Sequence, residues 1–409
     1  MNSPTRSLLG ARWRQACAVL IAGSSLAALL VACGGGGSNP PAAGGGPTIQ
    51  SVARGPINGL GSIIVNGVRF DDSSAQVEND EDGSAGHSAR ELKLGMMVEV
   101  QAGAIDNNAA TATAAVVRFG SEMVGLVAST DKATQTLRVL DQTIDVKPTT
   151  VFEDGLAGFD AIVKDQVLEI HAQFDATTGH YVATRIETEA GATAFRLRGV
   201  ISALNNTSPK TFKIGDAVIN FDSVPAADLP IIPLADGQTV RVRLQTVQVA
   251  GQWVATSVRN GVRKVEDSGD ARLRGMVTAF TSPQKFAVQG IPVDAANATF
   301  EPDAKSVVLG ALVEVRGQAS NGTIVATRVK VRNQNDDDLK QVELHGTVSA
   351  LDTSKTTFML REVKIDYSQV KTWKDGQPTD LVNDKKVEVK GVWSADHSVL
   401  IAAVIDFET

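Results

Sequence analysis

The five histidines are the first side chains to consider for metal or acid–base chemistry. They are scattered along the chain, at His87, His171, His180, His345 and His397. No two form a short-spaced pair, and the only cysteines, Cys17 and Cys33, lie near the N-terminus. Because zinc sites draw on closely spaced cysteine and histidine ligands, we predict no metal site and expect these histidines on solvated or strand surfaces.

Two acidic segments have a partial likeness to calcium loops. Asp71 and Asp72 precede the run Glu78-Asn79-Asp80-Glu81-Asp82-Gly83, in which oxygen ligands alternate before a glycine. A calcium loop starts with Asp and has Glu at its twelfth position, whereas this run starts with Glu78 and reaches Ala89. A second cluster spans residues 333–338. We expect solvated polar loops and no cofactor, with calcium-dependent folding as a further possibility.

No pattern typical of an enzyme is present. Gly59-Leu60-Gly61 matches a fragment of a dinucleotide-binding motif but lacks the helix that should follow it. No Ser, His and Asp ordering carries a nucleophile elbow. We therefore predict that the chain is not an enzyme, with no catalytic and no cofactor-binding residues.

Composition limits the ligands that the chain could bind. Removal of the first 32 residues takes away three arginines and no acid, which leaves 36 basic against 46 acidic residues, a net charge of −10. Such a surface opposes nucleic acids and anionic lipid heads, so we expect no nucleic-acid partner.

Trp253 and Trp393 occupy similar places near a last hairpin and could bind a glycan or peptide. Trp253 sits in an alternating strand, however, and is also compatible with a core position.

A five-fold internal repeat organises the chain and positions these residues. Its clearest segment is an apolar–polar–apolar triplet whose middle residue is Glu99, Glu169, Arg241, Glu314 or Glu388, at steps of 70, 72, 73 and 74 residues. Two copies precede it with Leu-Gly, at Leu94-Gly95 and Leu309-Gly310. A fixed period of this kind is the signature of tandem domains.

Each copy has the pattern of a small β domain. Val98 and Val100 should face one side and Glu99 the other, as in a half-buried strand. Asn66-Gly67, between apolar alternations, predicts a two-residue hairpin turn. The stretch Ser88 to Leu92 could form one short helical turn, and no segment has a long apolar stripe at helical spacing.

About five short strands in roughly 65 residues would leave two open edges in a flat sheet. Closure into a barrel removes those edges, so we predict an all-β chain of about five small closed OB-like or Greek-key barrels, in preference to a continuous β-solenoid. A domain so small is marginally stable alone, so packing between neighbours should add stability. The expected copies, numbered one to five, are residues 50–120, 121–191, 192–267, 268–338 and 339–409.

The N-terminus has the features of an export signal. Basic residues precede an apolar run that is too short to span a membrane. The run ends in Leu30-Val31-Ala32-Cys33, which resembles the bacterial lipobox and implies a signal peptide at 1–32 and acylation of Cys33. Residues 33–49 form a Gly/Pro-rich tether, and Gly34 after the cysteine favours the outer membrane.

Three stretches resemble the bacterial domain of unknown function 5666 (DUF5666). They are residues 55–70, 94–100 and 309–317, and the resemblance is strongest in copies one and four. It covers about residues 50–407, and the lipobox with its Gly-rich tether also looks like members of this group. The resemblance implies a fold and no settled activity.

These features predict a non-enzymatic lipoprotein of the cell envelope. Acylated Cys33 would hold it in membrane lipid, with the repeats in the periplasm or at the cell surface. The repeats would act as a spacer or as an interaction array for an envelope protein or glycan. The alternative is an enzyme, or a glycan- or peptide-binding protein, with its site in a cleft between adjacent repeats.

Overall fold

The computed structural model describes residues 49–80, 85–153, 156–333 and 336–408. The expected signal peptide, Cys33 and almost all of the tether lie outside the described residues. Within the described part, the one α-helix is the single turn α1 (Asp337–Lys340). None of the helices described there is long and apolar enough to cross a membrane.

Copy one is a closed five-stranded barrel. Its strands are β1 (Ser51–Leu60), β2 (Ile63–Val65), β3 (Val68–Asp71), β6 (Met97–Ala102) and β7 (Thr111–Phe119). The first three form an antiparallel meander. β3 then pairs in parallel with β7, β7 pairs antiparallel with β6, and β6 returns to β1. This closed Greek-key order is the predicted OB-like barrel.

The other four copies repeat this pairing order strand for strand. Their barrel strands are, in copy two, β8 (Met123–Asp131), β9 (Thr136–Val139), β10 (Gln142–Asp145), β12 (Val167–Asp175) and β13 (His180–Thr188); in copy three, β14 (Phe195–Asn205), β15 (Thr211–Ile214), β16 (Ala217–Asn220), β17 (Thr239–Leu244) and β18 (Trp253–Asn260); in copy four, β19 (Ser268–Ser282), β20 (Lys285–Val288), β21 (Ile291–Asp294), β23 (Leu312–Ser320) and β24 (Thr323–Arg332); and in copy five, β25 (Gln341–Asp352), β26 (Thr357–Leu360), β27 (Val363–Asp366), β29 (Lys386–Trp393) and β30 (Leu400–Phe407).

Short elements bridge the third and fourth barrel strands of each copy. They are β4 (Gln76–Asn79), β5 (Ala85–His87), η1 (Ala89–Glu91), β11 (Val151–Phe152), η2 (Phe159–Ala161), η3 (Ala226–Asp228), β22 (Thr299–Glu301), η4 (Ala304–Ser306), β28 (Thr372–Lys374) and η5 (Pro378–Asp380). The predicted helical turn after Ser88 is confirmed as η1, which Ser88 and Glu91 close in a reciprocal capping box.

Local patterns that the sequence displays are confirmed. Asn66 and Gly67 have φ values of 52° and 73° and join β2 to β3, as the two-residue turn requires. Val98 and Val100 are buried in the barrel interior. Such alternation fills each barrel with one face of its strands.

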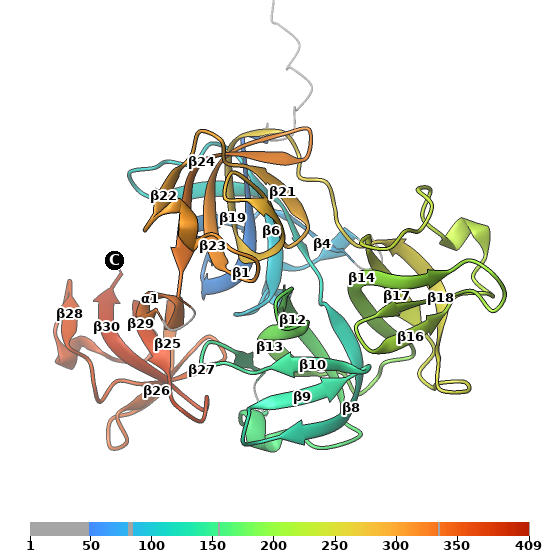
Figure 1. The fold of residues 1–409 in the computed structure, drawn as a ribbon. Coiled ribbons are helices and arrows are strands. Elements are labelled where there is room, and N and C mark those ends of the chain that lie inside the picture. Colours follow the sequence, from blue (N-terminus) through green and yellow to red (C-terminus); the bar gives the residue numbers. More distant parts are fainter. Residues whose placement is uncertain (1–48, 81–84, 154–155, 334–335, 409) are drawn as a thin grey trace, which may run out of the picture. The chain divides into compact units, whose positions relative to one another are not determined.

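The barrels are fused to one another through their first strands (Figure 1). β8 pairs with β14, so copies two and three share one apolar core. β1 pairs in parallel with β19 through its first half and with β25 through its last residues, and the cores of copies one and five are continuous. We predicted packing between neighbouring copies. The pairing of copy one with copies four and five was not predicted, because the alternation of residues along a strand does not identify its partner strands.

The two Leu-Gly motifs are contacts with copy two. The carbonyl of Leu94 accepts a hydrogen bond from Arg185, and the carbonyl of Leu309 accepts one from Thr177, each 3.1 Å long. Gly95 has φ +79°, and a Cβ there would collide with the carbonyl oxygen of Thr184. Glycine is therefore required both by the backbone conformation and by the close approach of copies one and two.

Candidate functional site

The outward residue of each apolar–polar–apolar triplet takes part in an ion pair. Glu99, Glu169, Arg241, Glu314 and Glu388 pair with Arg118, Arg196, Asp80, Arg332 and Lys390, respectively. Glu99 faces away from its own core, as predicted, yet is 5% exposed. Because other copies cover the outer faces, these residues form polar contacts between barrels as well as within them.

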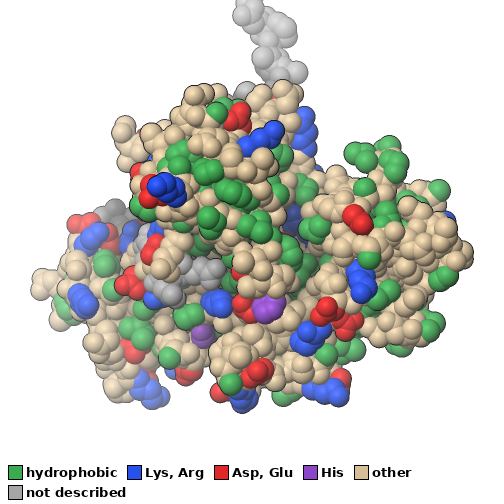
Figure 2. Space-filling model, in the orientation of Figure 1, with side chains coloured by type: hydrophobic (Ala, Val, Ile, Leu, Met, Phe, Trp, Pro, Cys, Tyr) green, Lys and Arg blue, Asp and Glu red, His purple; other side chains and the backbone are tan. Residues whose placement is uncertain are grey.

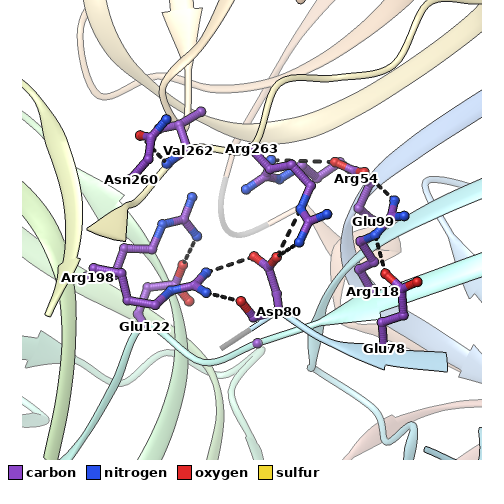
Figure 3. A network of polar contacts seen from close by, with 12 residues as sticks. Arg54, Glu78, Asp80, Glu99, Arg118, Glu122, Arg198, Asn260, Val262 and Arg263 are labelled. Atoms are coloured by element: carbon purple, nitrogen blue, oxygen red, sulfur yellow. Dashed lines mark hydrogen bonds and ion pairs between the residues drawn. The ribbon is translucent and has the colours of Figure 1, made fainter. Parts of the chain in front are cut away.

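An ion-pair network joins copies one, two and three (Figure 3). Asp80, which follows β4, accepts hydrogen bonds from Arg241 at 2.7 Å and from Arg263 at 2.6 Å. Arg198 of β14 donates to Glu122 just before β8 at 2.9 Å. In its described part, the acidic run around Glu78 and Asp80 is not the solvated loop that we expected, because these carboxylates bind arginines.

The network also sets the ionisation of its members. Burial alone would raise the pKa of Asp80, but the guanidinium groups of Arg241 and Arg263 outweigh burial and lower it. Burial lowers the pKa of Arg198 to about 10 despite the nearby Glu122. Asp80, Arg198 and Arg263 are therefore charged at neutral pH, and the network acts as a structural clamp.

A cleft of about 640 Å³ lies where copies one, two and five meet. Its walls contain residues from the end of β1, from the position after β3 and from η1 and the segment after it in copy one, from β11 and β13 of copy two, and from copy five. The lining side chains are Leu60, Asp72, Ala89, Arg90, Leu92, Lys93, Leu94, Val151, Phe152, Glu153, Arg185, Glu187, Arg361, Glu362, Val363 and Trp393. A smaller cavity of about 100 Å³ shares Leu94, Val151 and Trp393 with this cleft.

Trp393 and Trp253 differ in how their indole N–H groups are satisfied. Trp253 is buried in the core of copies two and three, and its Nε1 donates to Asp141 at 2.8 Å, as expected for a core residue. The Nε1 of Trp393 is also buried, but it has no hydrogen-bond partner among the described residues. A buried donor without a partner calls for an explanation, and Trp393 lines both the cleft and the smaller cavity.

The cleft is balanced in charge. Four carboxylates line it, from Asp72, Glu153, Glu187 and Glu362, against four cations, from Arg90, Lys93, Arg185 and Arg361. Arg185 pairs with Glu187 at 2.9 Å, and Lys93 pairs with Glu362. The apolar residues between them form a mixed surface that suits a neutral, polar ligand.

A buried histidine supports one wall of the cleft. His171 is 0% exposed, with Nε2 3.6 Å from Glu187 and Nδ1 3.1 Å from the carbonyl of Gly120. Burial acts to lower the pKa of His171, but Glu187 and other nearby carboxylates raise it overall. Burial acts to raise the pKa of Glu187, but His171 and Arg185 lower it to about 2.

We predicted that all five histidines would lie on solvated or strand surfaces, and two of them do not. His171 and His345 are buried, at 0% and 2% exposure, because their strands lie between copies. His87, His180 and His397 are partly exposed. The five remain dispersed, as their spacing indicated.

A second cavity, the cationic groove, lies on copy three. It measures about 900 Å³ and is lined by Arg196, Arg241, Arg243, Arg259, Arg263 and Lys264, with Asp80 and Asp228. The net charge of −10 conceals this local excess, although residues 192–267 contain nine basic and six acidic residues. On the face shown in Figure 2, charges of both signs are interspersed and hydrophobic side chains gather over copy four.

Comparisons with known proteins agree with the repeat. The sequence model of the domain of unknown function DUF5666 matches residues 124–187, 274–330 and 345–406. These segments lie in copies two, four and five; copy four was among the two expected to match best, whereas copy one is outside the matched segments. No curated protein matches the chain.

One solved structure, described as Drosophila Unr CSD456, matches with 14% identity and a TM-score of 0.17, covering 51% of this chain and 96% of that chain. We draw nothing from a likeness at that TM-score. The fold assignment depends on the closed strand order of each copy and on the three matched segments. The DUF5666 model thus matches three of the five repeats, copies two, four and five.

Proposed function

We propose that this protein is a non-enzymatic, lipid-anchored binding protein of the bacterial cell envelope, and that its cleft holds an uncharged, hydroxyl-rich ligand such as an oligosaccharide. The observation that carries the proposal is the buried, unpartnered indole N–H of Trp393 on the wall of a charge-balanced cleft. The proposed site lies between repeats, as in the glycan- or peptide-binding alternative that the sequence left open.

The chemistry of the lining favours a sugar over an ion. An indole presents an apolar face to the C–H groups of a sugar ring and an N–H to its hydroxyls. Carboxylates accept hydrogen bonds and guanidinium groups donate them, so both kinds of side chain can bind hydroxyl groups. Because four acids face four bases, neither a polyanion nor a polycation gains a net attraction.

The carboxylates of the cleft support binding rather than catalysis. Glu187 is held by Arg185, Glu362 by Lys93 and Glu153 by the Thr188 hydroxyl. Glycoside hydrolysis needs two carboxylates flanking the bond, one of them a proton donor. Burial raises the pKa of Asp72, and one such acid does not make that pair.

Anchoring follows from the lipobox-like segment that ends at Cys33. Acylation there would hold the protein in the outer membrane, and the Gly/Pro-rich tether would let the barrels turn freely. Fusion of the copies favours presentation of one composite cleft over an extended spacer.

The binding proposal is tested with the full mature protein and a panel of uncharged N-acetylglucosamine, glucose and mannose oligosaccharides. We expect tryptophan fluorescence to report saturable binding of at least one. Trp393→Phe keeps an aromatic ring but removes the N–H and part of the ring area. It should weaken binding at least tenfold, because a hydrogen bond is worth about 1 kcal/mol and the lost contact area adds to this. Trp253→Phe is the matched control, with binding unchanged.

Two outcomes would overturn the proposal: no member of the panel binds, or Trp393→Phe binds as the wild type does while remaining folded. The anchoring is tested separately by metabolic labelling with a fatty acid. Labelling should be lost in Cys33→Ser, and label retained in that variant would contradict acylation at this residue.

A further inference from the structure

A histidine and two glutamates converge on the outer face of copy five. Glu343 and His345 lie two residues apart on β25, and Glu388 lies opposite His345 on β29. One ligand atom from each of the three lies within 4.8 Å of the others. His345 is 2% exposed, whereas Glu343 and Glu388 retain 24% and 18% side-chain exposure, so solvent can reach the carboxylates.

The imidazole is oriented from behind by a third carboxylate. Nδ1 of His345 lies 2.5 Å from Glu408 Oε1, and Nε2 lies 3.0 Å from Glu343 Oε1 and 3.7 Å from Glu388 Oε2. A carboxylate that accepts from one ring nitrogen while the other faces the ligands is the arrangement that commonly orients a metal-binding histidine.

Lys390 holds the same two glutamates by their other oxygens. Its Nζ lies 2.8 Å from Glu343 Oε2 and 2.9 Å from Glu388 Oε1. Each carboxylate therefore presents one oxygen to the lysine and the other toward Nε2 of His345. The ammonium group offsets charge and fixes the carboxylates without occupying the oxygens that face the imidazole.

We propose that Glu343, His345 and Glu388 bind a divalent transition-metal ion of the zinc class. The donors would be Nε2 of His345, Oε1 of Glu343 and Oε2 of Glu388, with Glu408 and Lys390 as supporting groups. One imidazole and two carboxylates suit Zn²⁺ or Mn²⁺ better than Ca²⁺, which prefers oxygen ligands alone. Three protein ligands leave further positions for water or a partner.

The site would lie beside the seam between copies one and five. Glu343 is the parallel partner of Gly59 in β1, and Arg361 donates to the carbonyl of His345 at 2.7 Å. A bound ion would cross-link β25 and β29 at this seam, with Glu408 after β30 held through His345. The metal should therefore stabilise the protein as well as bind to it.

The experiment is a titration of the chelator-treated full chain with Zn²⁺, and in a second arm with Mn²⁺, by isothermal titration calorimetry. One ion should bind per chain at this site, with a rise in Tm. Glu388→Gln and His345→Gln should each weaken binding at least tenfold, and Glu408→Gln about tenfold. His180→Gln removes another histidine that faces a carboxylate, Asp145 at 3.0 Å, and should leave binding unchanged.

A spectroscopic arm distinguishes this site from adventitious surface binding. Co²⁺ in place of Zn²⁺ should give visible absorption that Glu388→Gln, checked for folding by circular dichroism, abolishes. The absence of saturable binding with either metal would overturn the proposal. So would a folded Glu388→Gln protein that binds the ion as tightly as the wild type.

Discussion

The cleft around Trp393 and the cationic groove of copy three are both large cavities, but they are built differently. Three copies supply the cleft, whose acids and bases balance and whose walls are partly apolar. The groove lies on copy three, apart from Asp80, and is dominated by arginines, of which Arg243 and Arg259 are exposed. Fusion of barrels therefore creates a site of mixed polarity that is defined by its shape, whereas the face of a single barrel presents mainly positive charge.

The largest expected effect concerns the clamp between copies one and three. Asp80→Ala leaves Arg241, whose side chain is 14% exposed, and the more exposed Arg263 without their counter-ion. Removal of one partner of a buried ion pair costs about 3 kcal/mol, which urea denaturation should show. Asp216→Ala breaks an exposed pair with Arg138 and should cost less than about 1 kcal/mol. Equal losses in the two variants would show that Asp80 is not a buried clamp.

The second effect concerns the contact between copies one and two at Gly95. Gly95→Ala forces a positive φ on alanine and places a Cβ against the Thr184 carbonyl, so unfolding free energy should fall by about 3 kcal/mol. Gly67→Ala is the matched control, because Gly67 also has a positive φ but a Cβ added there would meet nothing within 4 Å; its cost should be about 1 kcal/mol. If Gly95→Ala costs no more than this control, copies one and two are not in close contact.

Much of the fold follows from local sequence, and little of the cleft does. Turn residues such as Asn66-Gly67 and strand alternation act over a few neighbours, so the barrels and their hairpins were predictable. The pairing of β1 with β19 and β25 joins segments more than 200 residues apart, as in Ser51 with Asp270. Because the sequence does not reveal this long-range pairing, the polar residues that the pairing covers were predicted to be solvated. The Leu-Gly motifs, present in two copies only, were the one sequence signal of close contact.

The third prediction is a pH dependence at the wall of the cleft. The pKa of Glu187 is lowered from 4.5 to about 2, so its contribution to stability is complete above pH 4.5 and is lost as the pH falls toward 2. The pKa of His171 is raised above 6.5, so its contribution is complete below pH 6.5 and is lost as the pH rises through the higher value. The difference in unfolding free energy between wild type and Glu187→Gln should thus be greatest between about pH 4.5 and 6.5. A difference that instead grows above that window would contradict the ion pair.

The smallest effect concerns the groove. Arg243→Gln with Arg259→Gln should weaken binding of a sulfated polysaccharide probe at low salt by roughly threefold to tenfold, since exposed ion pairs contribute up to about 1 kcal/mol each. Binding of the same probe to the wild type should fade as salt rises. Oligosaccharide binding in the cleft should be insensitive to both the salt and the double variant. A cleft ligand that is lost with salt would remove the distinction between the two regions.

The most direct measurement is the indole N–H resonance of Trp393 in the ¹⁵N-labelled mature protein during titration with an oligosaccharide that binds. A ligand in the cleft should shift the Trp393 resonance and leave that of Trp253, which is bonded to Asp141, in place. Saturating ligand that leaves the Trp393 resonance unmoved would contradict the proposal that its buried N–H is part of the binding site.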